Sequence, residues 1–210
     1  MNGNKGKLIK SIDNIMKDDT SLKLFLKSIY SLKPSLKRIL WLTILFIIIY
    51  NFYSLFLVKN IDGITSTIEI INNVYIIIIP IFAIIITGYA IFQALTNGRT
   101  LMALMRANEN DRSKFQEYNY FFFSISILYL TIIIINFLLS IILGNLPEGW
   151  YFVYFNKELN NKLFSVFVSI YIVFIVNALI EMKSFIYNLY QLFSSHAIAS
   201  AIEQLKKNDE

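Results

Sequence analysis

The residues that could do chemistry in this sequence are few and stand apart from one another. The single histidine, His196, follows Ser194 and Ser195, and the chain has no cysteine. Hydrolytic chemistry of the triad type needs a histidine, a hydroxyl and an acidic group held together, and a zinc site needs several ligands. No acidic cluster lies near His196 in the sequence. We therefore expect His196 to pack against another helix or to be solvated.

Motifs that would mark an enzyme or a cofactor site are missing from the sequence. It has no glycine-rich phosphate loop, no HEXXH pattern and no triad constellation. Without cysteine, disulfides and thiolate metal sites are excluded. The basic residues are explained by membrane topology before nucleic acid is needed. The sequence thus predicts a protein that is not an enzyme, with no catalytic residue, cofactor, metal or direct nucleic-acid contact.

The segments that hold these residues are long apolar runs. The 210 residues are 56% hydrophobic and 16% charged, whereas a soluble domain carries nearer a quarter charged residues. A bilayer core of roughly 30 Å needs about 20 apolar residues in a helix. The predicted fold class is an all-α integral membrane protein, a four-helix transmembrane bundle with cytoplasmic amphipathic helices. The predicted spans are residues 39–58, 74–95, 120–143 and 163–182.

Soluble segments flank these spans. Residues 1–38 form a basic amphipathic arm, predicted either to lie on the inner leaflet or to pack on the cytoplasmic loop or a neighbouring subunit. Pro34 predicts a break in the helix at Lys33. The transmembrane domain takes residues 39–187, with a cytoplasmic loop at 96–119. The last span continues into a cytoplasmic helix over 183–210, whose apolar residues form one stripe.

The distribution of positive charge predicts the topology. Sixteen of the nineteen Lys and Arg residues lie in the arm, the loop after the second span and the C-terminal segment. Cytoplasmic segments carry such an excess. We expect a multi-pass protein of the bacterial inner membrane with both termini in the cytoplasm.

The predicted spans have no ionisable residue at their centres, where one would mark an ion or proton pathway. Glu181 comes closest, and we expect it to be solvated at the inner end of the last span. Amide side chains could form hydrogen bonds between helices or line a pore in an oligomer. These candidate polar contacts are Asn51, Gln93, Asn136 and Asn177.

The second span contains two residues that could form a hinge, Pro80 and Gly88. Proline removes a helical hydrogen bond, and glycine lets a neighbouring helix approach closely, so ordinary packing is the alternative. After this span the loop carries basic residues that could contact lipid headgroups or a cytoplasmic partner protein. They are Arg99, Arg106, Arg112 and Lys114.

The layout of Ile86–Ile134 has a glycine-bearing span, a short Leu-rich and Arg-containing helix, a polar turn and an aromatic-led span. It resembles small multi-span membrane proteins of bacterial anti-phage defence systems, such as the Kiwa membrane subunit and four-span effectors of cyclic-nucleotide-triggered systems. The resemblance implies an inner-membrane homo-oligomer that senses infection or perturbs the membrane, with a cytoplasmic partner.

Two functions stay open from the residues. The first is an inner-membrane oligomeric sensor or effector, which signals to a cytoplasmic partner or forms a pore. The alternative is an accessory or immunity-type membrane protein, such as a bacteriocin immunity factor or a transporter subunit.

Overall fold

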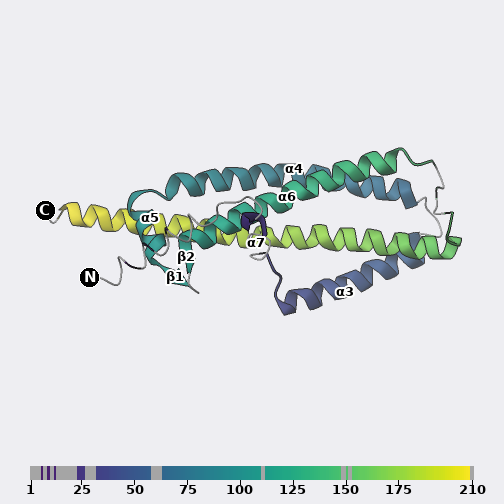
Figure 1. The fold of residues 1–210 in the computed structure, drawn as a ribbon, viewed down its shortest axis with the longest axis horizontal. Coiled ribbons are helices and arrows are strands. Elements are labelled where there is room, and N and C mark those ends of the chain that lie inside the picture. Colours follow the sequence, from purple (N-terminus) through teal and green to yellow (C-terminus); the bar gives the residue numbers. More distant parts are fainter. Residues whose placement is uncertain are drawn as a thin grey trace. The chain divides into compact units, whose positions relative to one another are not determined.

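The computed structural model describes residues 6, 9, 12, 23–26, 32–57, 63–109, 112–147, 150 and 153–208. The two predicted placements of the N-terminal arm concern residues that lie mostly outside these ranges. Figure 1 shows the elements, numbered from α3. In chain order they are α3 (Leu36–Phe52), the π-helix η1 (Tyr53–Leu57), α4 (Gly63–Leu95), α5 (Gly98–Arg106), β1 (Asn108–Glu109), β2 (Arg112–Ser113), α6 (Lys114–Gly144) and α7 (Lys157–Asn208).

Four of these helices are long and apolar enough to cross a membrane, as the sequence predicts. α4, α6 and α7 extend beyond the predicted spans, because hydropathy marks only the apolar part of a helix and no breaker stops the polar turns. α3 begins three residues before its predicted start, and η1 ends at Leu57, one residue before the predicted end of the span. α4 begins eleven residues before the predicted start at residue 74. α7 runs without interruption for 52 residues, and this confirms the predicted continuation of the last span as a helix.

The breaks between helices have local causes. Lys33, Pro34 and Ser35 are not helical, and the Ser35 hydroxyl accepts a hydrogen bond from the Arg38 amide at the start of α3. At the start of α5, Gly98 has a φ of 45°, a conformation that glycine adopts without steric cost. After α5, β1 and β2 form a two-stranded antiparallel pair in which Asn108 lies opposite Ser113.

The chain folds as two compact units. We call Pro34–Phe82 with Leu128–Ile180 the apolar unit. We call Met1–Lys33, Ala83–Ile127 and Glu181–Glu210 the aromatic unit. α4, α6 and α7 each contribute a part to both units.

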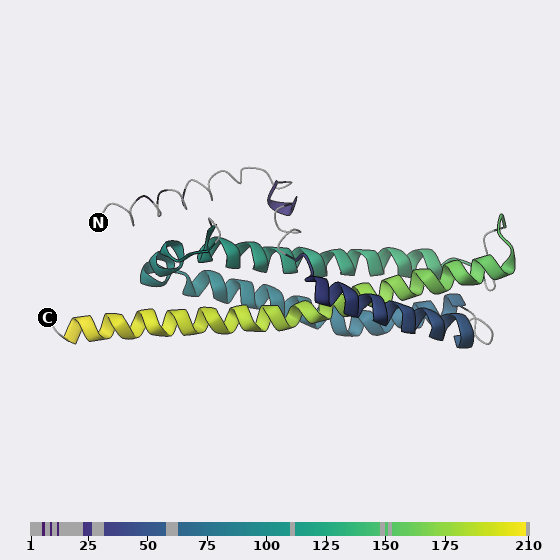
Figure 2. The same ribbon diagram turned by 90° about the horizontal axis from the view of Figure 1, so that it is seen from below.

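Side chains at intervals of seven residues form the buried face of α4. Ile71, Ile78, Ile85 and Phe92 are all fully buried, and this spacing keeps one helix face toward its neighbours. Other faces of the same helix expose large apolar residues, such as Ile76 at 73%. Within α3 no residue is buried, and the helix contacts α7 in the apolar unit (Figure 2). Apolar side chains that face outward are compatible with a multi-pass membrane protein.

Candidate functional site: polar helix contacts and a pocket between α6 and α7

Asn136 on α6 makes the most buried of the predicted polar contacts. Its side chain is fully buried in the apolar unit, where the Tyr171 hydroxyl of α7 donates a 2.8 Å hydrogen bond to Asn136 Oδ1. Among the described residues, Asn136 Nδ2 has no hydrogen-bond partner. Asn136 therefore joins two helices inside the unit, which is one of the two roles predicted for it.

Asn177 contributes its main chain, whereas its buried side-chain Oδ1 has no hydrogen-bond partner among the described residues. Arg38 Nη2 of α3 donates a 2.8 Å hydrogen bond to the Asn177 carbonyl oxygen, and the Tyr129 hydroxyl of α6 donates one of 3.0 Å to the carbonyl of the next residue, Ala178. Neighbouring carbonyls of α7 thus accept bonds from two other helices. The contact of Arg38 was not predicted, because a basic residue at the start of a predicted span indicates topology before it indicates a contact.

The other two amides lie on exposed surfaces. Asn51 is exposed and donates to the Ile47 carbonyl of its own helix at 2.8 Å. Gln93 in the aromatic unit is exposed and donates to Asn119 Oδ1 at 3.3 Å, and the Tyr89 hydroxyl donates to the same oxygen at 2.9 Å. Asn51 therefore does not join the contacts between helices that Asn136 and Asn177 make, and Gln93 belongs to the other unit. Asn119, which joins α6 to α4, was not predicted, because a single asparagine before an aromatic run resembles a turn residue.

The expectation that Glu181 is solvated is wrong. Its side chain is only 5% exposed. α7 continues past the predicted end of the span, so Glu181 falls on the same face as the buried residues Ala178 and Phe185, three residues before it and four after it. A residue at the end of an apolar run can therefore be buried when the helix continues beyond that run.

Gly88 lies against the ring of Phe185 in the aromatic unit. It is buried, and a Cβ added there would overlap Phe185 Cζ and lie 3.0 Å from Cε2. The absence of a side chain at Gly88 thus permits close packing of the two helices. Such packing is the alternative to a hinge that the sequence left open for this residue. The second hinge candidate, Pro80, is exposed and lies inside the continuous helix α4.

An aromatic cluster surrounds this contact. The ring centroid of Phe122 lies 5.1 Å from that of Phe92, 5.6 Å from that of Phe185 and 6.1 Å from that of Tyr89. Phe115, on the first turn of α6, lies 5.7 Å from Phe92. Rings from α4, α6 and α7 thus form the core of the aromatic unit.

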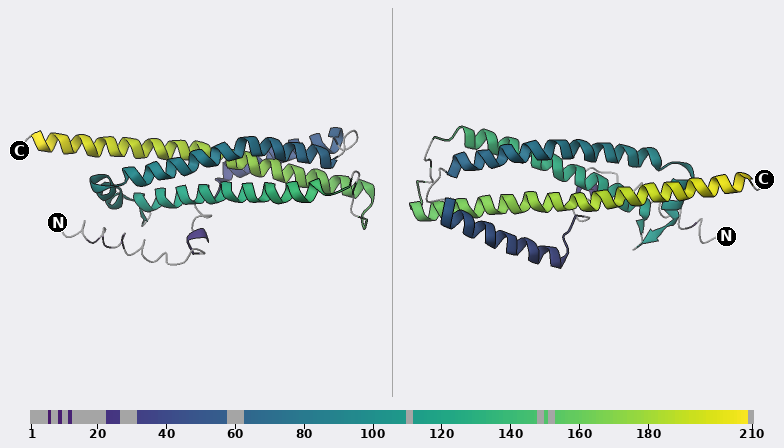
Figure 3. Two further views of the ribbon diagram at one scale, coloured as in Figure 1. Left: turned by 90° about the horizontal axis from the view of Figure 1, so that it is seen from above. Right: turned by 180° about the vertical axis from the view of Figure 1, so that it is seen from behind.

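Helix α5 packs on the C-terminal part of α7 (Figure 3). Thr100, Leu104 and Met105 form its buried face, and Thr100 Oγ1 lies 3.0 Å from His196 Nδ1. This contact confirms the prediction that His196 serves helix packing or is solvated. The predicted basic residues Arg99 and Arg106 are both exposed, on a different face of α5 from the buried one.

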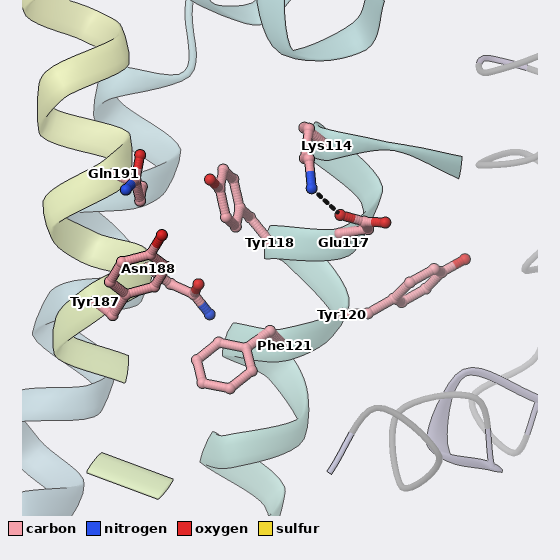
Figure 4. Close-up of a pocket in the computed structure, with 8 residues that line it drawn as sticks. All are labelled: Lys114, Glu117, Tyr118, Tyr120, Phe121, Tyr187, Asn188 and Gln191. Atoms are coloured by element: carbon pink, nitrogen blue, oxygen red, sulfur yellow. Dashed lines mark hydrogen bonds and ion pairs between the residues drawn. The ribbon is translucent and has the colours of Figure 1, made fainter. Parts of the chain in front are cut away.

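The remaining two predicted basic residues differ in setting. Arg112 belongs to β2, and its side chain lies outside the described part. Lys114 begins α6 and forms a 3.0 Å ion pair with Glu117. It also borders the pocket that Figure 4 shows between α6 and α7 in the aromatic unit, with a volume of about 420 Å³. The lining residues are Lys114, Glu117, Tyr118, Tyr120, Phe121, Tyr187, Asn188 and Gln191.

Among the described residues, no group of three or more His, Cys, Asp and Glu side chains could hold a metal ion. No family model matches the chain, and neither a curated protein nor a solved structure is significantly similar to it. The function of this chain therefore has to be inferred from its own residues and from the resemblance seen in its sequence.

Proposed function

We propose that this chain is a multi-pass protein of the bacterial inner membrane, with both termini in the cytoplasm, that acts as a homo-oligomeric sensor or effector in defence against phage. It works by a conformational change of its helices, which is passed to a cytoplasmic partner or opens a path through the membrane.

The observation that carries this proposal is the continuity of α7. One hydrogen-bonded helix contains the predicted span at 163–182 and continues to Asn208. A shift or rotation of a span is therefore passed along the same helix to residues beyond the predicted bilayer, without a loop that would absorb it. The charge distribution supports the topology, and the layout of Ile86–Ile134 supports the place in phage defence.

Exposed apolar residues on the C-terminal part of α7 support self-association. Ile186, Tyr190, Ile198 and Leu205 each expose more than 60% of their surface, and they follow one another at helical spacing. Copies in one membrane share one orientation, so identical faces without charge can pack in parallel around an axis normal to the membrane.

Phage challenge of cells that express the chain tests the proposal. We expect a lower plating efficiency for at least one phage of a diverse panel, with a change in membrane potential, followed with a dye, during infection. Ile198→Glu places a charge on the exposed apolar face and should abolish protection. The matched control Ile198→Leu keeps the same exposed position apolar and should retain it. Plating and membrane potential unchanged across the whole panel would contradict the proposal.

A further inference from the structure

The pocket between α6 and α7 carries one positive and one negative charge. Lys114 and Glu117 border it from the first turn of α6, with their side chains 34% and 31% exposed. Their 3.0 Å ion pair is thus open to water on one side, where such pairs contribute little stability. A ligand with both charges could separate the pair without leaving either charge unpaired.

Aromatic and amide side chains form the walls. Figure 4 shows Tyr118 and Phe121 extending from α6 toward α7, where Tyr187, Asn188 and Gln191 face them. Tyr120 extends from the other side of α6 in the same view. Faces of aromatic rings attract ammonium groups, and the two amides offer both donors and acceptors.

Polarity changes along the pocket in the direction of the predicted bilayer. Its charged pair lies near the start of α6, and the apolar ring of Phe121 lies about two turns further along, just inside the predicted span that begins at residue 120. This order matches a molecule whose charged group lies at the membrane surface and whose apolar part enters the hydrocarbon. Tyrosine is also favoured at that depth.

We propose that this pocket binds the headgroup of a zwitterionic phospholipid of the phosphoethanolamine type. Lys114 binds the phosphate, and Glu117 with the rings of Tyr118 and Tyr187 binds the ammonium group. A volume of about 420 Å³ lies within the usual range for small-molecule sites. An anionic headgroup would pair with Lys114 but would be repelled by the carboxylate of Glu117. The inference rests on the proposed membrane location, and it adds a lipid class and its site.

Binding of short-chain lipids to the full-length protein in detergent tests the site. The probes are dihexanoyl phosphatidylethanolamine, dihexanoyl phosphatidylglycerol and free phosphoethanolamine, followed by native mass spectrometry. We expect the protein to bind the phosphatidylethanolamine about tenfold more tightly than the phosphatidylglycerol, the factor that one charge-assisted hydrogen bond supplies. Weak binding of free phosphoethanolamine supports a membrane lipid as the source, whereas equally tight binding of the chain-free headgroup would overturn the lipid assignment.

Glu117→Gln removes the negative charge and should reverse the preference toward phosphatidylglycerol. Glu158→Gln is the matched control, since Glu158 forms an exposed 2.6 Å ion pair with Lys162 and does not line the pocket. It should leave the preference unchanged. Equal affinities of the wild-type protein for the two lipids, or the same change in both variants, would overturn the proposal.

Vesicle flotation separates this result from a failure of the proposed location. A protein that does not float with vesicles contradicts the membrane location itself. A protein that floats but shows no headgroup preference contradicts the lipid site alone.

Discussion

Within each of the two units, the helices are joined by a different balance of interactions. In the apolar unit, hydrogen bonds join the helices: Arg38 to the Asn177 carbonyl, Tyr129 to the Ala178 carbonyl, and Tyr171 to Asn136. In the aromatic unit, stacked and edge-on rings of Tyr89, Phe92, Phe115, Phe122 and Phe185 fill the core.

The difference follows from the surroundings that the sequence predicts for each unit. Lipid tails are as apolar as leucine, so burial of apolar surface drives helix association weakly in a bilayer, and polar contacts between helices specify the packing. Near the membrane surface, water restores the hydrophobic contribution, and large rings provide most of the buried area. Substitutions of the same type should therefore have unequal effects in the two units.

The largest effect is expected from Phe122→Ala. This fully buried ring contacts rings of two other helices, so its removal should lower the free energy of unfolding by about 3–5 kcal/mol. Its matched control is Phe137→Ala on the same helix in the apolar unit, where the ring is 57% exposed and the loss should stay near 0.5 kcal/mol. Unfolding by SDS in mixed micelles, followed by circular dichroism, measures both. Equal losses would remove the distinction between the units.

Gly88→Ala should have the next largest effect. The new methyl group overlaps the ring of Phe185, and overpacking of this kind costs about 1–3 kcal/mol. Gly144→Ala is the control, because no atom lies within 4 Å of the added Cβ and alanine favours the helix by about 0.5–1 kcal/mol. The same unfolding assay should show opposite signs for the two substitutions. A stabilising Gly88→Ala would mean that the Phe185 contact is loose.

A smaller loss is expected from Tyr171→Phe in the apolar unit. The substitution removes the hydroxyl that donates to Asn136, and such bonds between membrane helices contribute about 0.6–1 kcal/mol. Tyr154→Phe, at a side chain that is 95% exposed, should change nothing. A double-mutant cycle with Asn136→Leu measures the coupling, and a coupling of zero would argue that hydrogen bonds do not specify this unit.

The smallest effect on stability is expected from the double substitution Arg99→Gln and Arg106→Gln. Both side chains are exposed, so unfolding should change by no more than about 0.5 kcal/mol. Each arginine near an anionic surface contributes about 1 kcal/mol of attraction to lipid. Without the two arginines, the accessibility of α5 to a labelling reagent should no longer depend on anionic lipid. Maleimide labelling of a cysteine at exposed Ala103, in nanodiscs with and without phosphatidylglycerol, measures this dependence.

The chain has no native cysteine, which makes that labelling specific. High salt should remove the same dependence from the protein with both arginines, because exposed charges are screened. Labelling that is slowed by anionic lipid to the same degree in both proteins would contradict a role of the two arginines in lipid binding. Labelling that anionic lipid does not slow in the protein with both arginines would favour a protein partner for them instead.

Much of the helical framework could be predicted from local features. Pro34 indicated the break before α3, and the long apolar runs indicated four helices that structure and hydropathy both support. The helix ends were less accurate, because α4 and α7 continue through polar residues that carry no breaker.

The candidate site was predicted less completely, since its residues acquire their roles from other helices. Asn136 and Asn51 are the same residue type in two apolar segments, yet one is buried against Tyr171 and the other bonds to its own helix. Arg38 and Asn119 gave no signal that set them apart from ordinary residues at a span end or a turn, and Glu181 was noticed but expected to be solvated.

By itself the sequence determined which segments are helical and apolar and which three segments carry nearly all of the positive charge. Helix formation, hydropathy and charge could be read in this way because they belong to single residues and their near neighbours. Only the tertiary structure decided which face of each helix is buried. The rotation of a helix depends on side chains far away in the chain, such as Phe185 against Gly88. For the same reason the pocket that begins at Lys114 exists only where α6 and α7 come together.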